Sequence, residues 1–274
     1  HMRTATAAPA SITPVQARDL KRWFLRYAAQ KVRLYPRHRE AMLLKVTHSV
    51  RVSRICAAIA ADLGLDGGRL RLARTIGLLH DVARFDQLIR YGTFVDRVSV
   101  DHGDLGAELL RATSLVNALA SADRAVLIHA VRHHNAATIP EKSVPGGSFY
   151  LKLVRDSDKL DIYRLLCDIW LQPNGREPAS EALELVDAPA VSPEIVAAIE
   201  SRHIAPMAAV KTTSDLLLVR MAWVFDLHFD PSFQRLERLG YTNRLGQVLP
   251  KTREISGLLK TIQGYVRGRV TAAA

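Results

Sequence analysis

The sequence is poor in cysteine: Cys56 and Cys167 are the only two among 274 residues. Two thiols cannot supply the several disulfides that stabilise small secreted domains. Because both cysteines lie among apolar residues in helical patterns, we expect them to be buried free thiols in a reducing compartment. A metal site in this chain would therefore be built from ligands other than thiolates.

Long hydrophobic runs are also missing, and no apolar stretch approaches the roughly 18 to 20 residues that a membrane span needs. The start of the chain, Met2 to Pro14, is small, polar and interrupted by proline, without the apolar core of a signal peptide. With 48% hydrophobic and 24% charged residues, the composition is that of an ordinary globular protein. We expect a cytoplasmic protein whose residues 1–13 form a disordered tail.

Acidic residues are scarce near the start of the chain. Residues 1–54 contain twelve Lys and Arg but only Asp19 and Glu40, so this segment carries a net charge of +10, nearly all of the +11 of the chain. Such a segment attracts nucleic acid, anionic lipid or a phosphorylated substrate. A solvated helix face is the competing and favoured interpretation, and the charge alone does not decide the function.

Strand-like alternation is hard to find anywhere, whereas apolar residues recur at helical spacing throughout. The fold class predicted is therefore all-α. We expect a single all-α domain over residues 14–274, with a core at about 40–170 and a C-terminal helical extension at about 190–270. Helices are predicted at residues 14–33, 40–63, 69–82, 102–110, 122–134, 151–165, 193–202, 212–229, 232–239 and 251–269.

Polar residues interrupt the apolar stripes of three predicted helices. His48 lies on the stripe of Leu44 and Val52, His80 and Asp81 end the helix that begins at Arg69, and Asp158 lies on the stripe of a later helix. Burying such groups costs several kcal/mol unless something pairs with them. A metal ion commonly does so for histidine and aspartate.

Further histidines stand at predicted helix ends: His102 at the start of one helix, and His133 and His134 at the end of another. Imidazole and carboxylate ligands without thiolates suit Fe, Mn, Ni, Co or Zn. The series exceeds the needs of one ion, so we expect two divalent metal ions with Asp81 as a bridge between them. Two-metal sites of this kind hydrolyse phosphate esters.

The sequence also resembles the HD superfamily of metal-dependent phosphohydrolases, and specifically a bacterial subgroup. The resemblance covers about residues 40–170 and is carried by several ordered segments. These are Leu44-Lys45-Val46-Thr47-His48, Leu78-Leu79-His80-Asp81-Val82-Ala83-Arg84-Phe85, Tyr91-Gly92-Thr93-Phe94, Ser99-Val100-Asp101-His102, His134-Asn135 and Arg155-Asp156-Ser157-Asp158-Lys159-Leu160-Asp161.

The resemblance implies an HD-domain helical bundle and a ligand set. His48, His80, Asp81 and Asp158 would bind the first metal. His102 and either His133 or His134 would complete a second site, and the His-Asn pair of the subgroup favours His134. The subgroup usually has alanine where this chain has Ser157, which leaves Asp158 as the ligand.

Asp81, Arg84 and Lys159 are the candidate catalytic residues. Arg84 follows His80 by one helical turn, where a guanidinium would bind a phosphate in a bidentate manner. A salt bridge from Arg84 to Asp86 or Asp81 is the competing interpretation. Lys159 adjoins Asp158 and is a candidate for stabilising charge on a leaving oxygen.

Three functions agree with these features. The first is a metal-dependent phosphomonoesterase or phosphodiesterase that acts on a nucleotide or a small phosphorylated metabolite. The second is a di-iron oxygenase, because some HD-superfamily members with a similar ligand set activate O₂. The third is a module that binds nucleic acid or a membrane through its basic segment and uses its metals structurally. Substrate, metal identity and oligomeric state are left open.

Overall fold

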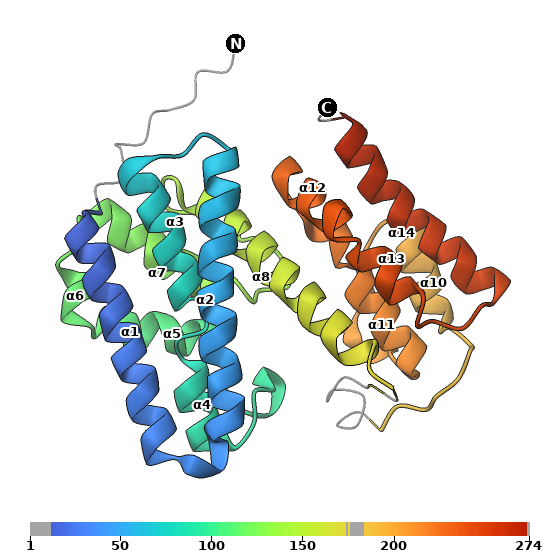
Figure 1. Cartoon of the computed structure of the whole chain (residues 1–274), viewed down its shortest axis with the longest axis horizontal. Helices are drawn as coiled ribbons and strands as arrows, with labels where there is room; N and C mark the ends of the chain where they lie inside the picture. The colour runs from blue at the N-terminus through green and yellow to red at the C-terminus, as the bar shows by residue number, and fades with distance from the viewer. Residues whose placement is uncertain (1–11, 174, 176–183, 273–274) are drawn as a thin grey trace. The chain divides into compact units, whose positions relative to one another are not determined.

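The structure is a computed structural model that describes residues 12–173, 175 and 184–272. The chain is all-α, as predicted (Figure 1). In the described part of the chain, the one β-type pairing is an isolated bridge between Val186 and Thr212. The contacts group into two compact units, one up to Asp158 and the other from Lys159 onwards.

The first unit contains most of the predicted histidine and aspartate ligands. Its elements are α1 (Pro14–Leu34), η1 (Pro36–His38), α2 (Arg39–Asp62), α3 (Gly67–Leu79), α4 (Arg84–Tyr91), η2 (Asp96–Val98), α5 (His102–Arg111), α6 (Ser114–Asn117), α7 (Ser121–His133) and the first half of α8 (Gly147–Trp170).

Local sequence signals set several of these boundaries. Thr13 and Gln16 form a capping box around Pro14, the first residue of α1. Asp101 caps α5, because its carboxylate accepts hydrogen bonds from the backbone N–H groups of Gly103 and Asp104. Polar side chains thus satisfy backbone donors at both helix starts.

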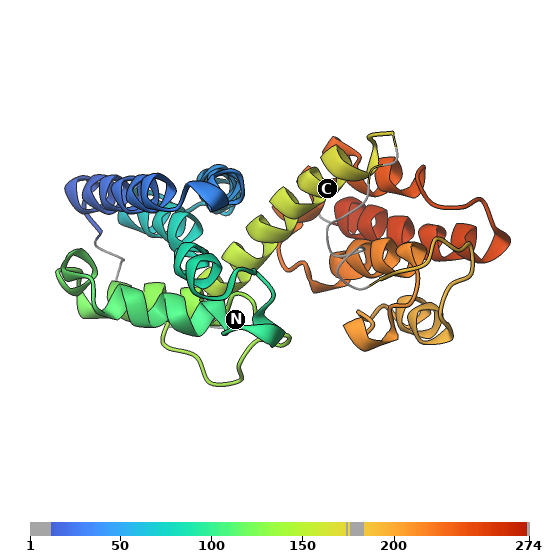
Figure 2. The same cartoon turned by 90° about the horizontal axis from the view of Figure 1, so that it is seen from below.

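Helices α1, α2 and α3 lie side by side, and α5 and α7 form a second layer against α3 (Figures 1 and 2). Phe24 of α1 and Phe85 of α4 are almost fully buried between these elements, and such burial stabilises a fold by about 1.5–3 kcal/mol per side chain. Gly77 permits the contact of α3 with α2, since a Cβ there would lie 2.7 Å from Cys56 Sγ and 3.0 Å from Val52 O.

The helix predicted to reach Val82 ends earlier, at Leu79, and a new helix, α4, begins at Arg84. In the turn between them, Val82 N donates to Leu79 O and Arg84 N donates to Asp81 O. Successive residues of a continuous helix point about 100° apart. The turn instead lets His80 and Asp81 face one centre.

The second unit contains the remaining helices and its own core. After the second half of α8 come α10 (Pro193–Glu200), η3 (Met207–Ala209), α11 (Thr213–Met221), η4 (Ala222–Asp226), α12 (Asp230–Leu239), α13 (Tyr241–Gly246) and α14 (Arg253–Ala272). The single helix predicted over 212–229 is therefore divided into α11 and η4. Tyr163 is fully buried and donates a hydrogen bond to Met221 O.

The two cysteines are free and buried, in agreement with the sequence-based prediction. Most of the expected N-terminal tail, residues 1–11, lies outside the described residues. The first described residue is Ile12, and its side chain is fully buried. Within the described ranges, no helix has both the length and the hydropathy that crossing a membrane requires.

Candidate metal centre

Four of the predicted ligands converge in what we call the first half-site: His48, His80, Asp81 and Asp158. His48 Nε2 lies 3.2 Å from His80 Nε2 and 3.0 Å from Asp158 Oδ1. Asp81 Oδ2 lies 3.7 Å from the Nε2 atoms of both histidines. Side chains from α2, from the turn after α3 and from α8 therefore face one point.

The second half-site contains Asp81, His102 and His134. His102 Nε2 lies 3.0 Å from His134 Nε2 and 3.3 Å from Asp81 Oδ1, and His134 Nε2 lies 3.6 Å from the same oxygen. Gly103 permits this approach of α5 to the end of α7, because a Cβ at Gly103 would lie 2.4 Å from Arg132 O.

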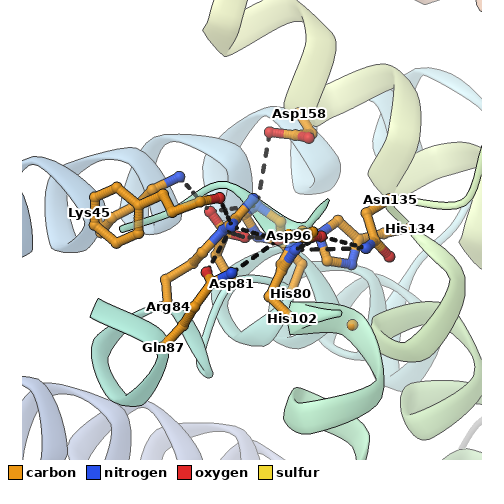
Figure 3. Close-up of polar contacts among 12 residues, drawn as sticks. Lys45, His80, Asp81, Arg84, Gln87, Asp96, His102, His134, Asn135 and Asp158 are labelled. Atoms are coloured by element: carbon orange, nitrogen blue, oxygen red, sulfur yellow. Dashed lines mark hydrogen bonds and ion pairs between the residues drawn. The ribbon is translucent and has the colours of Figure 1, made fainter. Parts of the chain in front are cut away.

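Asp81 is common to both half-sites, and each of its carboxylate oxygens faces a different one. Oδ2 faces His48 and His80, whereas Oδ1 faces His102 and His134. Figure 3 shows Asp81 among the imidazoles and Asp158 pointing towards them from α8. The carboxylate has the orientation expected of a bridge between two ions.

Three of the imidazoles are oriented by acceptors behind them. His80 Nδ1 lies 2.9 Å from Gly77 O, and His134 Nδ1 lies 2.7 Å from Val131 O. His102 Nδ1 lies 2.6 Å from Asp96 Oδ2. Because a carbonyl or a carboxylate accepts only, each Nδ1 must donate, and each Nε2 is the ring nitrogen aimed at the cluster.

Asp96 is in turn held by a polar network from the loop after α4. Its Oδ1 accepts hydrogen bonds from Arg84 Nη1 and Gln87 Nε2, both at 2.9 Å, and its Oδ2 accepts one from Asn135 Nδ2 at 3.1 Å. Arg84 Nη1 also donates to Phe94 O and to Gln87 Oε1. The orientation of His102 is therefore fixed by at least three further side chains.

The pKa shifts of Asp81, Asp158 and His134 suit metal ligands, whereas burial of His102 is outweighed by its hydrogen bonds with Asp81 and Asp96, which raise its pKa. Burial raises the pKa of Asp81, but Lys45, His80 and Arg84 more than offset this and hold that pKa well below its usual range. Burial also raises the pKa of Asp158, but its hydrogen bonds with His48 and His80 more than offset this and hold that pKa well below the usual value. Burial lowers the pKa of His134 to about 4. Both carboxylates are thus charged at neutral pH, and His134 is neutral.

This donor set fits divalent metal ions. His48, His80 and Asp158 offer three ligand atoms within 4.8 Å of one another, and so do His80, Asp81 and His134. Imidazole nitrogens and carboxylate oxygens without a thiolate suit Fe, Mn, Co, Ni or Zn. Proteins usually orient metal-binding imidazoles through a hydrogen bond at the other ring nitrogen, and His80, His102 and His134 all have one.

The family model of the HD domain matches residues 46–170, a range that contains every ligand of both half-sites. The matched residues form an HD domain. The name refers to the adjacent histidine and aspartate that stand here as His80 and Asp81, and HD domains are in general metal-dependent hydrolases. No curated protein and no solved structure matches the chain at a significant level.

Within the HD domain, His133 stands apart from the other predicted ligands. Its ring packs against that of His129 at a centroid distance of 4.8 Å, and the two residues line a separate cavity. His134 rather than His133 contributes Nε2 to the second half-site.

The two predicted catalytic cations have different surroundings. Arg84 Nε lies 3.3 Å from Asp81 Oδ1, so the guanidinium adjoins the centre and also forms one of the salt bridges considered from sequence. The other candidate partner, Asp86, instead accepts from Tyr27 and Lys31 of α1, both at 2.5 Å. In the second unit, Lys159 Nζ lies 2.8 Å from Asp226 Oδ2.

Lys45 is a site residue that sequence reasoning did not identify. Its Nζ lies 2.8 Å from Asp81 Oδ2, and it lies 5.3 Å from the centroid of the Phe94 ring. Lys45 precedes His48 by three residues on α2, which puts both on one helix face. That spacing was the signal in the sequence that could have identified Lys45 as a neighbour of the metal ligands. Lys31 and Lys45 show that part of the basic N-terminal segment pairs with carboxylates of the HD domain.

Proposed function

We propose that this HD-domain protein is a metal-dependent phosphohydrolase with a dinuclear centre, and that it acts on a nucleotide or another small phosphorylated metabolite. The observation that carries the proposal is the division of Asp81 between two sets of imidazoles, with one oxygen facing each set. A carboxylate in this position can hold two ions about 3.5–4 Å apart, the separation that two-metal hydrolases use.

In this proposal, His48, His80, Asp81 and Asp158 hold one ion, and Asp81, His102 and His134 hold the other. Such a pair of ions supplies a nucleophile derived from water at neutral pH and charge stabilisation for a phosphoryl group. The second half-site has three protein ligands and the first has four, so the second offers more open coordination to water and substrate.

The protein contributes positive charge beside the centre. Lys45 and Arg84 contact opposite oxygens of Asp81, at 2.8 and 3.3 Å, and both flank the ring of Phe94. Among the described residues, Arg84 forms hydrogen bonds through Nε and Nη1, which leaves Nη2 to donate to a phosphate oxygen. Two cations at one edge of the centre favour an anionic substrate.

The polar network keeps these groups in place during turnover. Asp96 accepts hydrogen bonds from both His102 and Arg84 and so fixes the imidazole relative to the guanidinium. The side chain of Arg84 is 14% exposed, which limits its freedom to move. Positioning of this kind lowers the entropy that must be lost when substrate and nucleophile align.

The test combines metal analysis with a screen of phosphomonoesters and phosphodiesters. Wild-type protein should contain up to about two equivalents of divalent metal and hydrolyse a subset of the esters. Asp81→Asn should lose both metals and reduce kcat by more than about 10³-fold, because it removes the one ligand common to both half-sites.

Asp86→Asn is the matched control, since Asp86 is also a buried carboxylate but pairs with Tyr27 and Lys31 of α1. This variant should keep its metals and its activity. Hydrolysis by metal-free wild-type protein would contradict the proposal. Bound iron with O₂ consumption, and no ester hydrolysis under anaerobic conditions with Mn²⁺, would instead support the oxygenase alternative.

A further inference from the structure

A cavity lies along α7, away from the metal centre. It has a volume of about 350 Å³, within the roughly 300–1,000 Å³ that small-molecule sites occupy. Ala125 lines it, and His134 follows Ala125 by nine residues, which is about two and a half turns of an α-helix. The cavity and the metal ligand are therefore on opposite faces of α7.

Three arginines line this cavity: Arg111, Arg124 and Arg132. Arg132 is partly neutralised, because its Nε lies 2.6 Å from Asp104 Oδ1. Arg124 Nη1 donates to Asn117 O at 3.1 Å, a contact that leaves its charge uncompensated. Within the described part of the chain, no carboxylate lies within 4 Å of the guanidinium of Arg111 or Arg124. The cavity therefore has an excess of positive charge.

The rest of the lining combines imidazoles with apolar side chains. The rings of His129 and His133 lie 4.8 Å apart at an angle of 61°, and His129 Nε2 lies 3.0 Å from Ser143 Oγ. Ile128 and Val144 supply apolar surface beside them. Small-molecule sites typically have such a mixture, in which apolar walls hold the body of the ligand and a few polar groups orient it.

We propose that this cavity binds a phosphorylated small molecule, with its phosphate at Arg111 and Arg124 and its organic part against Ile128 and Val144. Guanidinium groups are well suited to phosphate, because their parallel N–H donors match two phosphate oxygens. This binding site is distinct from the metal centre. The proposal depends on the cavity and its lining residues, and it does not depend on the reaction that the metal centre catalyses.

The experiment is a calorimetric titration of metal-loaded protein with inorganic phosphate and, separately, with adenosine 5′-monophosphate. Adenosine 5′-monophosphate should bind wild-type protein at a site that survives Asp81→Asn. Arg111→Gln with Arg124→Gln should weaken that site by at least about tenfold, as expected for the loss of charge-assisted hydrogen bonds. Inorganic phosphate should bind the same site more weakly, since it lacks the organic part.

Arg26→Gln with Arg39→Gln is the matched control, since it removes the same charge from two exposed positions on α1 and α2. This control should keep the site. Ala125→Phe should block the site by filling the cavity while every arginine is retained, which separates occupancy of the cavity from general electrostatic attraction.

Equal binding by the two arginine double variants would overturn the proposal. Binding that disappears with Asp81→Asn would also overturn it, because the ligand would then belong to the metal centre. Salt-sensitive binding of a single-stranded oligonucleotide that depends on Arg111 and Arg124, without binding of adenosine 5′-monophosphate, would assign these arginines to nucleic acid instead.

Discussion

The two half-sites share Asp81 but are held together in different ways. The first takes its other ligands from α2, from the turn after α3 and from α8, so its geometry depends on how these elements pack. The second takes His102 and His134 from the facing ends of α5 and α7. There, His102 Nδ1 donates a hydrogen bond to Asp96, and Asn135 donates another to the same carboxylate. The first half-site thus depends mainly on packing, and the second on a polar network.

This difference has a physical consequence for metal binding. Where ligands are held by packed helices, a polar substitution nearby changes little unless it removes a ligand. Where a ligand is oriented by hydrogen bonds, the loss of one such bond weakens metal binding by about 10–100-fold. The half-sites should therefore respond differently to substitutions that leave every ligand in place.

The largest effects should follow from removing one ligand on each side. Asp158→Asn should lose the metal of the first half-site, because Asp158 Oδ1 lies beside His48 and His80. His134→Gln should lose that of the second, because His134 Nε2 lies beside His102 and Asp81 Oδ1. Each variant should retain about one metal equivalent. Activity should fall by more than roughly 100-fold, the upper end of the loss that is typical when a residue hydrogen-bonded to a metal ligand is replaced. Metal content per protein after desalting measures this. Loss of both metals in either variant would show that the half-sites bind as one unit.

A smaller and one-sided effect should follow from Asp96→Asn. The variant keeps every ligand but loses the carboxylate that accepts from His102 Nδ1 and Arg84 Nη1. Affinity should fall by about 10–100-fold at the second half-site and stay unchanged at the first. Competition with a chelator measures both affinities. Asp230→Asn, which breaks an ion pair with Arg269 in the second unit, is the control. An equal loss at both half-sites would remove the distinction between them.

Helical periodicity was sufficient to predict the all-α fold and to place His48, His80 and Asp158 inward. It could not predict the break after Leu79, because the residues from Arg69 to Val82 have an apolar pattern that a continuous helix also satisfies. The turn reorients His80 and Asp81 towards one centre. That centre is defined by ligands from α2, α5 and α8, so the sequence of this segment alone does not indicate the turn.

The network around Asp96 was beyond sequence reasoning for a related reason. Asp96, Gln87 and Asn135 are brought together from η2, α4 and the segment after α7, and no periodicity relates them. Lys45 differs, since its spacing of three residues from His48 on α2 was visible in the sequence. The spacing could not show, however, that Asp81 lies close enough to accept a hydrogen bond from the Lys45 ammonium group.

The smallest effect should follow from His133→Gln, and it sharpens the definition of the second half-site. His133 and His134 are adjacent, and sequence alone left either as the ligand. In the structure, His134 faces Asp81, whereas His133 packs on His129 at the cavity of α7. His133→Gln should therefore keep both metals with unchanged affinity, while His134→Gln loses one. A loss of metal from the His133 variant that matched the loss from the His134 variant would mean that the end of α7 adopts a different orientation when metal binds.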